Sequence, residues 1–322
     1  MRTDNRTLYE IKDDTERYIL ILWSVTVLVA SLTGGSVVLV ATIRFKAIHQ
    51  HKVIVTVMQH MAACDILMTA LKVFPITLAL IADQWILGEV LCHLEENIGW
   101  VCVLVTIYLT CAMTTLKLII VTFPLKTGAW TSSLGHRICL VLWLLGLACC
   151  IPTLTVRMLY IRDTIHFRYQ LYSCHYDPLS PSVPSWYLRY SLISLVTGSI
   201  LSYTTLLLTS SMLLVVAKRT ASLHGETLRW EGVTTVLLTV GVVVVSYLPG
   251  TVVRVTSLMG VPYSSSCFRA TYNLAELNVM SNFFVYSLTM RSFREFLRMR
   301  MTKLCLFAKQ VQMPVRLQEL KQ

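Results

Sequence analysis

Seven long apolar segments run through the chain, and shorter polar stretches separate them. Each is near or above the ~20 residues that a helix needs to cross the hydrocarbon core of a bilayer. A segment in lipid must satisfy its own backbone groups, and the alternating pattern of a lipid-facing strand is absent, so we expect helices. The predicted spans are Tyr18–Ile43, Val53–Ala82, Leu91–Phe123, Ile138–Val156, Tyr187–Ala217, Val233–Met259 and Ala270–Met290.

Two further patterns lie outside these spans. The stretch from His166 to Tyr176, in the largest loop, alternates large apolar with polar residues and predicts a short exposed hairpin. After the seventh span, Phe293, Phe296 and Leu297 share one stripe while most of the arginines lie elsewhere, which predicts an amphipathic helix on the inner leaflet.

The sequence therefore predicts an all-α fold class, a seven-transmembrane helix bundle with a short amphipathic eighth helix. We expect an extracellular N-terminal segment over residues 1–17, the bundle over 18–290, and a cytoplasmic amphipathic helix and tail over 291–322. No internal repeat or low-complexity linker stands out, so the bundle is one domain.

Composition and charge support a membrane protein and give its orientation. The chain is 55% hydrophobic and 14% charged, whereas soluble proteins are about 25% charged. The side that holds the C-terminal tail carries 17 Lys or Arg against four acids, and the other side carries 9 against nine. Because basic residues favour the cytoplasmic side, we expect a multi-pass plasma-membrane protein with its N-terminus outside. The net charge of +11 then indicates attraction to the lipid bilayer and not nucleic-acid binding.

Two motifs predict modification. Asn5, in the triplet Asn-Arg-Thr, fits an N-glycosylation acceptor on the outer side. Cys305, near the end of the amphipathic helix, is a candidate for S-palmitoylation, with an ordinary free thiol as the alternative.

Two of the ten cysteines are candidates for a disulfide. Most of the others lie within spans, where cysteine acts as a small hydrophobe. Cys92, at the outer start of the third span, and Cys174, in the large outer loop, both face the oxidising side. A bridge between them would pin the loop over the bundle. Cys267 is the main competing partner.

Ionisable side chains inside or at the mouth of the spans are the main functional candidates, because a charge in lipid is costly. Two compatible interpretations stay open. The charges neutralise one another inside the bundle, for example Lys72 with Glu276, or they line a polar cavity that receives a ligand from outside. The candidate side chains are Asp65, Lys72, Glu95, Glu96, Arg254 and Glu276.

Several short motifs follow one another in a distinctive order along the spans. They are Asp65 in "MAACD", "WILG" (Trp85–Gly88) shortly before Cys92, Trp143 alone in the fourth span with Pro152 following, Cys174, Tyr247-Leu248-Pro249, "LNVMSNFFVY" (Leu277–Tyr286) and the following "SFREFLR". In this order and spacing the chain resembles the rhodopsin-like (class A) G-protein-coupled receptors. The resemblance covers essentially Tyr18 to Cys305.

The resemblance implies a receptor, not an enzyme. It would bind an extracellular ligand and signal to a heterotrimeric G protein by helix rearrangement. Lys117 stands where the family has the arginine that contacts the G protein, and Leu116 replaces the adjacent acid. Lysine keeps the charge but lacks the planar fork of donors, and an alternative is that Lys117 only snorkels to the inner interface. Arg229 and Tyr286 are expected to join it at the cytoplasmic end.

Four polar residues match the family positions that surround a sodium ion, and no other cofactor is expected. A buried carboxylate needs such compensation. A protonated Asp65 that is merely hydrogen-bonded is the alternative. The matching residues are Asp65, Thr106, Asn278 and Asn282.

The ligand is expected to be a peptide or a small polar molecule. Gly99 stands where amine receptors carry an aspartate, so an amine held by that ion pair is not expected. The predicted hairpin and charged mouth favour a peptide, whereas the aromatic residues favour a small-molecule pocket. The candidate ligand-binding residues are Lys72, Glu96, Gly99, Trp100, Tyr247, Arg254, Tyr272 and Glu276.

Other functions remain as alternatives. The altered inner motif allows a receptor-like protein that does not couple to G proteins. An ion- or proton-linked transporter is less favoured, because seven unequal spans without a repeat do not fit the repeated halves of transporters. A membrane enzyme ranks last, because no histidine pair at ligand spacing and no Gly-x-Ser-x-Gly motif occurs.

Overall fold

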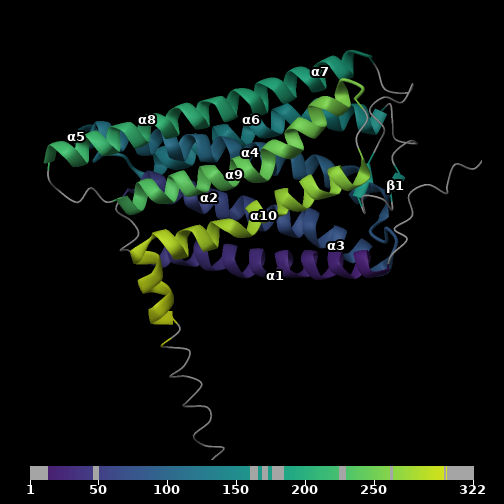
Figure 1. Cartoon of the computed structure of the whole chain (residues 1–322), viewed down its shortest axis with the longest axis horizontal. Coiled ribbons are helices and arrows are strands. Elements are labelled where there is room, and N and C mark those ends of the chain that lie inside the picture. The colour runs from purple at the N-terminus through teal and green to yellow at the C-terminus, as the bar shows by residue number, and fades with distance from the viewer. Residues whose placement is uncertain are drawn as a thin grey trace, which may run out of the picture.

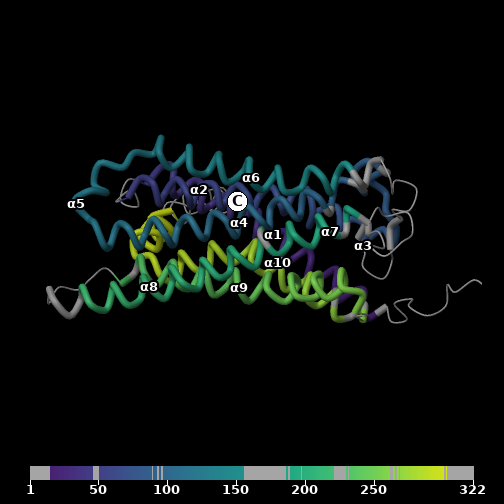
Figure 2. Tube along the Cα trace, turned by 90° about the horizontal axis from the view of Figure 1, so that it is seen from above, coloured from purple at the N-terminus to yellow at the C-terminus, as the bar shows by residue number. Residues whose placement is uncertain are grey.

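The fold is an elongated bundle of helices that run side by side along its long axis (Figure 1). The computed structural model describes residues 14–45, 51–159, 166–168, 173–175, 185–224, 230–261, 264–300 and 302. A view from above shows the same lengthwise packing (Figure 2), with α5 and the end of α8 at one end of the bundle and α3 and α7 at the other.

Helices cover all the predicted spans, which confirms the all-α bundle. At 1.5 Å per residue, each pass is longer than the ~30 Å hydrocarbon core of a bilayer. The passes are α1 (Asp14–Arg44), α2 (Lys52–Met68) continued by the π-helical turn η2 (Thr69–Val73) and α3 (Phe74–Ala82), α4 (Gly88–Thr122), α6 (Ser132–Leu159), α7 (Ser185–Leu195) continued by η4 (Val196–Ile200) and α8 (Leu201–His224), α9 (Trp230–Leu258) and α10 (Ser265–Thr289). A short helix, α5 (Pro124–Thr127), links α4 to α6.

Six of these passes are long and apolar enough, by length and composition, to cross a membrane. α10 is the exception among the described passes, and it carries the buried polar side chains of Glu276, Asn278 and Asn282. Its lower hydropathy therefore reflects a polar face turned into the bundle.

The structure describes helix α1 from Asp14 onward, so its first described turn precedes the predicted start at Tyr18. Arg17 then fixes this turn, because its Nε donates to the Leu80 carbonyl at 3.0 Å and its Nη1 lies 3.5 Å from Asp83 Oδ2.

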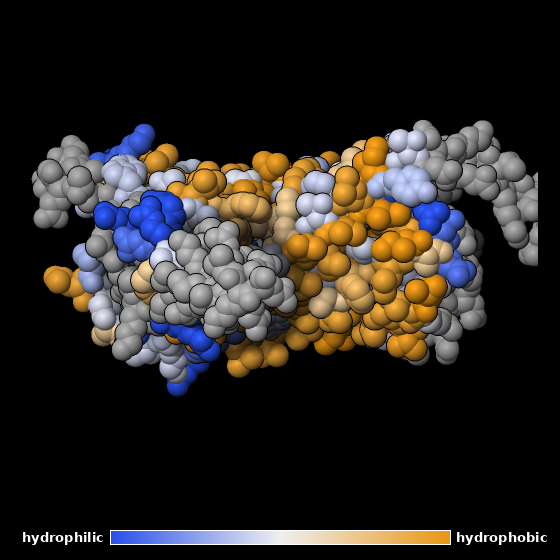
Figure 3. All heavy atoms as spheres, turned by 90° about the horizontal axis from the view of Figure 1, so that it is seen from below, coloured by the Kyte–Doolittle hydropathy of each residue, from blue (hydrophilic) through white to orange (hydrophobic). Residues whose placement is uncertain are grey.

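The exterior of the bundle is apolar. Large side chains such as Leu140, Val141 and Leu144 on α6 and Leu207 and Leu208 on α8 are more than half exposed. Figure 3 shows a broad hydrophobic surface in the middle of the molecule, with hydrophilic residues towards its ends. Such a surface is larger than soluble monomers expose, and it fits a bilayer around the bundle.

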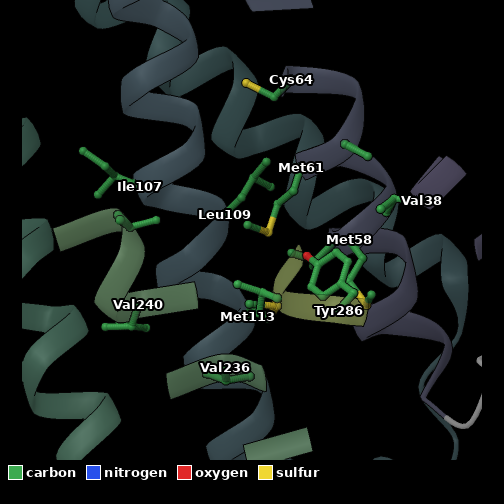
Figure 4. Packing of buried hydrophobic residues seen from close by; sticks show 14 of the residues in the cluster. Val38, Met58, Met61, Cys64, Ile107, Leu109, Met113, Val236, Val240 and Tyr286 are labelled. Atoms are coloured by element: carbon green, nitrogen blue, oxygen red, sulfur yellow. The ribbon is translucent and has the colours of Figure 1, made fainter. Parts of the chain in front are cut away.

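The inner half of the bundle is held by a sulfur-rich apolar core. Met58 and Met61 of α2, Met113 of α4 and Val236 of α9 are buried in one cluster with Tyr286 from α10 (Figure 4). Methionine side chains adapt to irregular gaps, and this core joins four helices.

The chain is helical again from residue 291 to 300, as the amphipathic pattern predicts. Phe293 and Phe296 are buried, and Phe296 packs against Phe45 with ring centroids 5.7 Å apart. Arg291 and Glu295 are exposed and pair on the outer side of this helix. In Figure 1 the segment turns away from the axis of α10, as a helix lying on the inner leaflet would.

The large outer loop contains the expected hairpin. Strands β1 (His166–Arg168) and β2 (Ser173–His175) pair antiparallel, with Phe167 opposite Cys174. β2 contacts α4, and Cys92 of α4 is disulfide-bonded, whereas Cys267 is a free, exposed thiol. The pairing of Cys92 with Cys174 stays a prediction. Asn5, Arg229 and Cys305 lie outside the described residues.

If Cys92 bridges Cys174, Cys92→Ser and Cys174→Ser should reduce surface expression to the same degree, and the double substitution should cost no more than either one. The reason is that each change removes the same bond. Flow cytometry of intact cells measures this, with Cys267→Ser as the control that keeps normal expression. A single variant with normal expression would argue against the bridge.

Candidate functional site

A cavity of about 810 Å³, which includes space open to solvent, lies among η2, α4, α9 and α10 in the half of the bundle predicted to face outside. We call it the outer cavity. Seven of the eight predicted ligand-binding residues line it, namely Lys72, Gly99, Trp100, Tyr247, Arg254, Tyr272 and Glu276. The side chain of Glu96 lies outside the described part of the structure.

Lys72 enters the outer cavity from the π-helical turn η2. A π turn holds one extra residue, so the helix beyond it is rotated relative to a regular helix, and such turns are frequent at functional sites. Lys72 Nζ lies 3.8 Å from Glu95 Oε1 and 4.4 Å from the centroid of the Tyr272 ring. The structure therefore pairs Lys72 with Glu95, and not with Glu276 as the sequence allowed.

Gly99 gives Lys72 the space it occupies. A Cβ at Gly99 would lie 2.5 Å from Lys72 Cδ and 3.0 Å from its Cε, so any larger side chain would displace the lysine. A cation from η2 thus fills the place beside α4 where the resemblance puts the aspartate of amine receptors. The geometry agrees with the expectation that an amine is not bound at this point.

Two buried carboxylates lie on this side of the bundle, and one of them, Glu276, lines the outer cavity. Glu95 accepts a hydrogen bond from the Tyr272 hydroxyl at 3.1 Å, and Glu276 accepts one from Trp23 Nε1 at 2.9 Å. Both glutamates are almost fully buried. Sequence reasoning missed Trp23, although an indole N–H in an apolar span needs a buried acceptor and could have indicated it.

On the opposite side, Arg254 stacks on Trp100. The guanidinium carbon lies 4.1 Å from the centroid of the indole ring, a cation–π geometry that stabilises by about 0.5–2 kcal/mol. The outer cavity therefore has a cation at the α9 side and, at the η2 and α10 side, a second cation, Lys72, and the carboxylate of Glu276.

Beneath the outer cavity, buried polar groups connect helices in pairs. Asn278 donates to the Tyr247 hydroxyl at 2.9 Å, and Asn282 donates to Asp65 Oδ2 at 2.7 Å. The Thr106 hydroxyl lies 3.6 Å from Cys64 Sγ. The structure thus brings Asp65 and Asn282 into direct contact, while Asn278 and Thr106 bond to other partners.

At the inner end, Lys117 reaches from α4 to α9. A Cβ at Gly232 would lie 2.5 Å from Lys117 Nζ and 3.0 Å from its Cε, so the end of the lysine side chain lies directly over this glycine. Leu116 is buried in the core. The Tyr286 hydroxyl is buried and has no hydrogen-bond partner among the described residues.

Residues 34–289 match the model of the family described as 7 transmembrane receptor (rhodopsin family). The chain belongs to this family. The receptor therefore takes its fold and broad class from the rhodopsin family, whose members are not enzymes.

Two known proteins are similar to this receptor. Neuropeptide Y receptor type 5 from Sus scrofa is 27% identical over 141 residues, which are 44% of this chain and 30% of that protein. The receptor thus matches about a third of the length of this curated relative. Squid rhodopsin has the same fold, with a TM-score of 0.75, 14% identity, and coverage of 92% of this chain and 88% of that one.

The Lys72–Glu95 pair gives a stability prediction for the receptor. Lys72→Met should destabilise strongly, because loss of one partner of a buried pair leaves an uncompensated charge and costs about 3–5 kcal/mol. Adding Glu95→Gln should restore much of the loss. Thermal unfolding in detergent measures both. Arg291→Ala is the control, because it breaks the exposed pair with Glu295 and should change the unfolding temperature little. If the losses from Lys72→Met and Glu95→Gln simply add in the double variant, the pairing of Lys72 with Glu95 is contradicted.

Proposed function

We propose that this receptor binds an extracellular peptide or small polar ligand in the outer cavity and signals to a heterotrimeric G protein. One observation carries the proposal. The cavity is lined by charges of both signs, the buried Lys72 and Glu276 and the half-buried Arg254, inside a bundle where charge is costly. Charged groups on a ligand would form ion pairs with these side chains. The name of the relative, a neuropeptide receptor, adds support for a peptide.

A contact chain offers a route from the cavity to the inner half of the bundle. Tyr247 lines the cavity and holds Asn278 of α10, and one turn further along α10 Asn282 holds Asp65 of α2. Pro249 lies two residues after Tyr247, and proline kinks a helix. A ligand that presses on Tyr247 would shift the population between two packings of α9 and α10.

At the inner end, we propose that Lys117 closes α4 against α9 in the packing described and contacts the G protein when α9 moves away. Arg229 and Tyr286 would lie at the same surface. The orphan Tyr286 hydroxyl costs about 1–3 kcal/mol while it stays buried, which favours a second packing that lets it reach water. We also propose a plasma-membrane location with the N-terminus outside.

A sodium ion fits the polar core. Asp65 supplies a carboxylate, Thr106 a hydroxyl, and Asn278 and Asn282 amide carbonyls, and all four side chains are buried. Hard cations prefer such oxygen ligands. When bound, the ion would supply a positive charge that compensates Asp65, while Asn282 orients the carboxylate.

Sodium binding should stabilise the packed receptor, because an ion that binds only the folded state raises its stability by mass action. The purified protein should unfold at a higher temperature in sodium chloride than in choline chloride at equal ionic strength. Asp65→Asn should abolish the difference. An equal response in wild type and Asp65→Asn would refute the site.

The coupling role of Lys117 predicts opposite effects for two substitutions. Gly232→Ala displaces the end of Lys117 from α9 but keeps the lysine, so basal G-protein activation should rise severalfold. Lys117→Ala removes the contact group, so activation should fall, and Lys117→Arg should retain it. Nucleotide exchange with a panel of G proteins, in membranes that contain the receptor, measures all three.

Gly241→Ala is the matched control, because it makes the same change in α9 but nothing lies within 4 Å of the added Cβ. It should leave basal activation unchanged. If no G protein responds to wild type or to any variant, the receptor is a non-coupling binder. Currents or uptake across the membrane instead would favour the transporter alternative.

A further inference from the structure

A second cavity, of about 550 Å³, lies among α4, α6, α7, η4 and α9. We call it the side cavity. None of its residues is among the ligand-binding candidates from the sequence except Trp100 and Arg254, which line both cavities. The stacked pair of Arg254 and Trp100 is therefore the shared wall between the outer cavity and the side cavity.

The polar groups of the side cavity are neutral apart from Arg254. Five uncharged polar side chains from three passes line it, and no carboxylate occurs among the described lining residues. The outer cavity, in contrast, contains Glu276. The two cavities thus share one cation, and only the outer cavity also has a carboxylate among its described lining residues. The neutral polar residues are Asn97, Thr153, Ser191, Ser194 and Ser199.

Two of these hydroxyls have no partner in the described part of the chain. The Oγ atoms of Ser191 and Ser199 are buried without a hydrogen bond, and Ser199 is fully inaccessible. An unsatisfied buried hydroxyl costs about 1–3 kcal/mol. Ser202, on the same pass, donates its hydroxyl to the Gly198 carbonyl at 2.7 Å. Ser191 and Ser199 instead remain free to donate to an acceptor in the cavity.

We propose that the side cavity binds a carboxylate of the receptor's ligand. Arg254 supplies the opposite charge, and the hydroxyls of Ser191 and Ser199 supply hydrogen-bond donors. Charge-assisted hydrogen bonds of this kind are among the stronger ones in proteins. The inference rests on the proposed function, and it adds the chemical class of one ligand group. A free small carboxylic acid and the C-terminal carboxylate of a peptide share this chemistry.

Two cysteines of the side cavity allow its preference for charge to be measured by chemical labelling. Cys149 and Cys150 line it, and both are free thiols. The receptor is purified in detergent and treated with an anionic reagent, 2-sulfonatoethyl methanethiosulfonate, or a cationic one, 2-(trimethylammonio)ethyl methanethiosulfonate. Each forms a mixed disulfide with the thiol and releases methanesulfinate. Peptide mass spectrometry measures labelling of the two cysteines, and each rate is divided by the reaction rate with 2-mercaptoethanol.

The proposal predicts that the anionic reagent labels Cys149 or Cys150 at least severalfold faster than the cationic one. Arg254→Gln should remove the preference. Arg189→Gln, an exposed arginine of α7 outside the cavity lining, is the matched control and should keep it. No labelling, equal rates, or a preference that survives Arg254→Gln overturns the proposal.

Protection against labelling tests the ligand group and its source. At millimolar concentration, 4-hydroxyphenylacetate should slow labelling and its amide should not. A short peptide with a free C-terminus is compared with the same peptide amidated. Protection by the small acid supports a free carboxylic acid, and protection by the free peptide alone supports a peptide terminus. Equal protection by acid and amide, or protection by neither acid, overturns the proposal.

Ser199→Ala separates a binding role from a structural one. Because the substitution removes a buried hydroxyl without a partner, the unfolding temperature should rise. The carboxylic acid that slows cysteine labelling in wild type should protect the variant severalfold less. A structural serine would change stability without changing protection. Labelling and protection require no G protein. If the receptor fails to activate any G protein but passes these tests, the coupling proposal is refuted and the carboxylate site is still supported.

Discussion

Lipid makes it costly for a polar group of this receptor to lack a partner inside the bundle. A bilayer core offers no water, so an unpaired backbone or side-chain group costs several kcal/mol there. The helices satisfy their backbones themselves, but side chains must be matched across helices. The pairs Lys72–Glu95 and Asp65–Asn282 are the result, the first joining consecutive passes and the second joining passes far apart in sequence. The same constraint turns the apolar faces of α6 and α8 outwards.

These cross-helix partners also place the functional residues. Lys72 is held by Glu95 and Tyr272, so its charge sits at the edge of the outer cavity and beside Gly99. Tyr247 is both a cavity wall and the acceptor for Asn278. A group that stabilises the bundle is thus also a group that a ligand in the proposed site would touch. Binding there would therefore be coupled to the packing of α10.

Hydrophobic pattern and charge were enough to predict the seven passes, the hairpin and the amphipathic eighth helix. They were not enough to predict which side chains pair with one another across the helices. Lys72 meets Glu95 because the π turn η2 changes the rotation of the helix, and nothing in the local sequence marks that extra residue. Trp23 was missed because its role depends on α1 lying beside α10. The side cavity was missed for the same reason, since serines on an apolar pass look like ordinary backbone-bonded hydroxyls until the neighbouring helices are in place.

The inner end shows how a departure from the family pattern can be accommodated. Lysine has one compact charged group on a long flexible stem, whereas arginine carries a broad planar fork. Lys117 lies over Gly232, where the absence of a Cβ leaves room for the stem and the ammonium group against α9. An acid next to the lysine is replaced by Leu116, which packs into the core. Close packing over a glycine is thus one part of the contact between Lys117 and α9, and it depends on the absence of a side chain at residue 232.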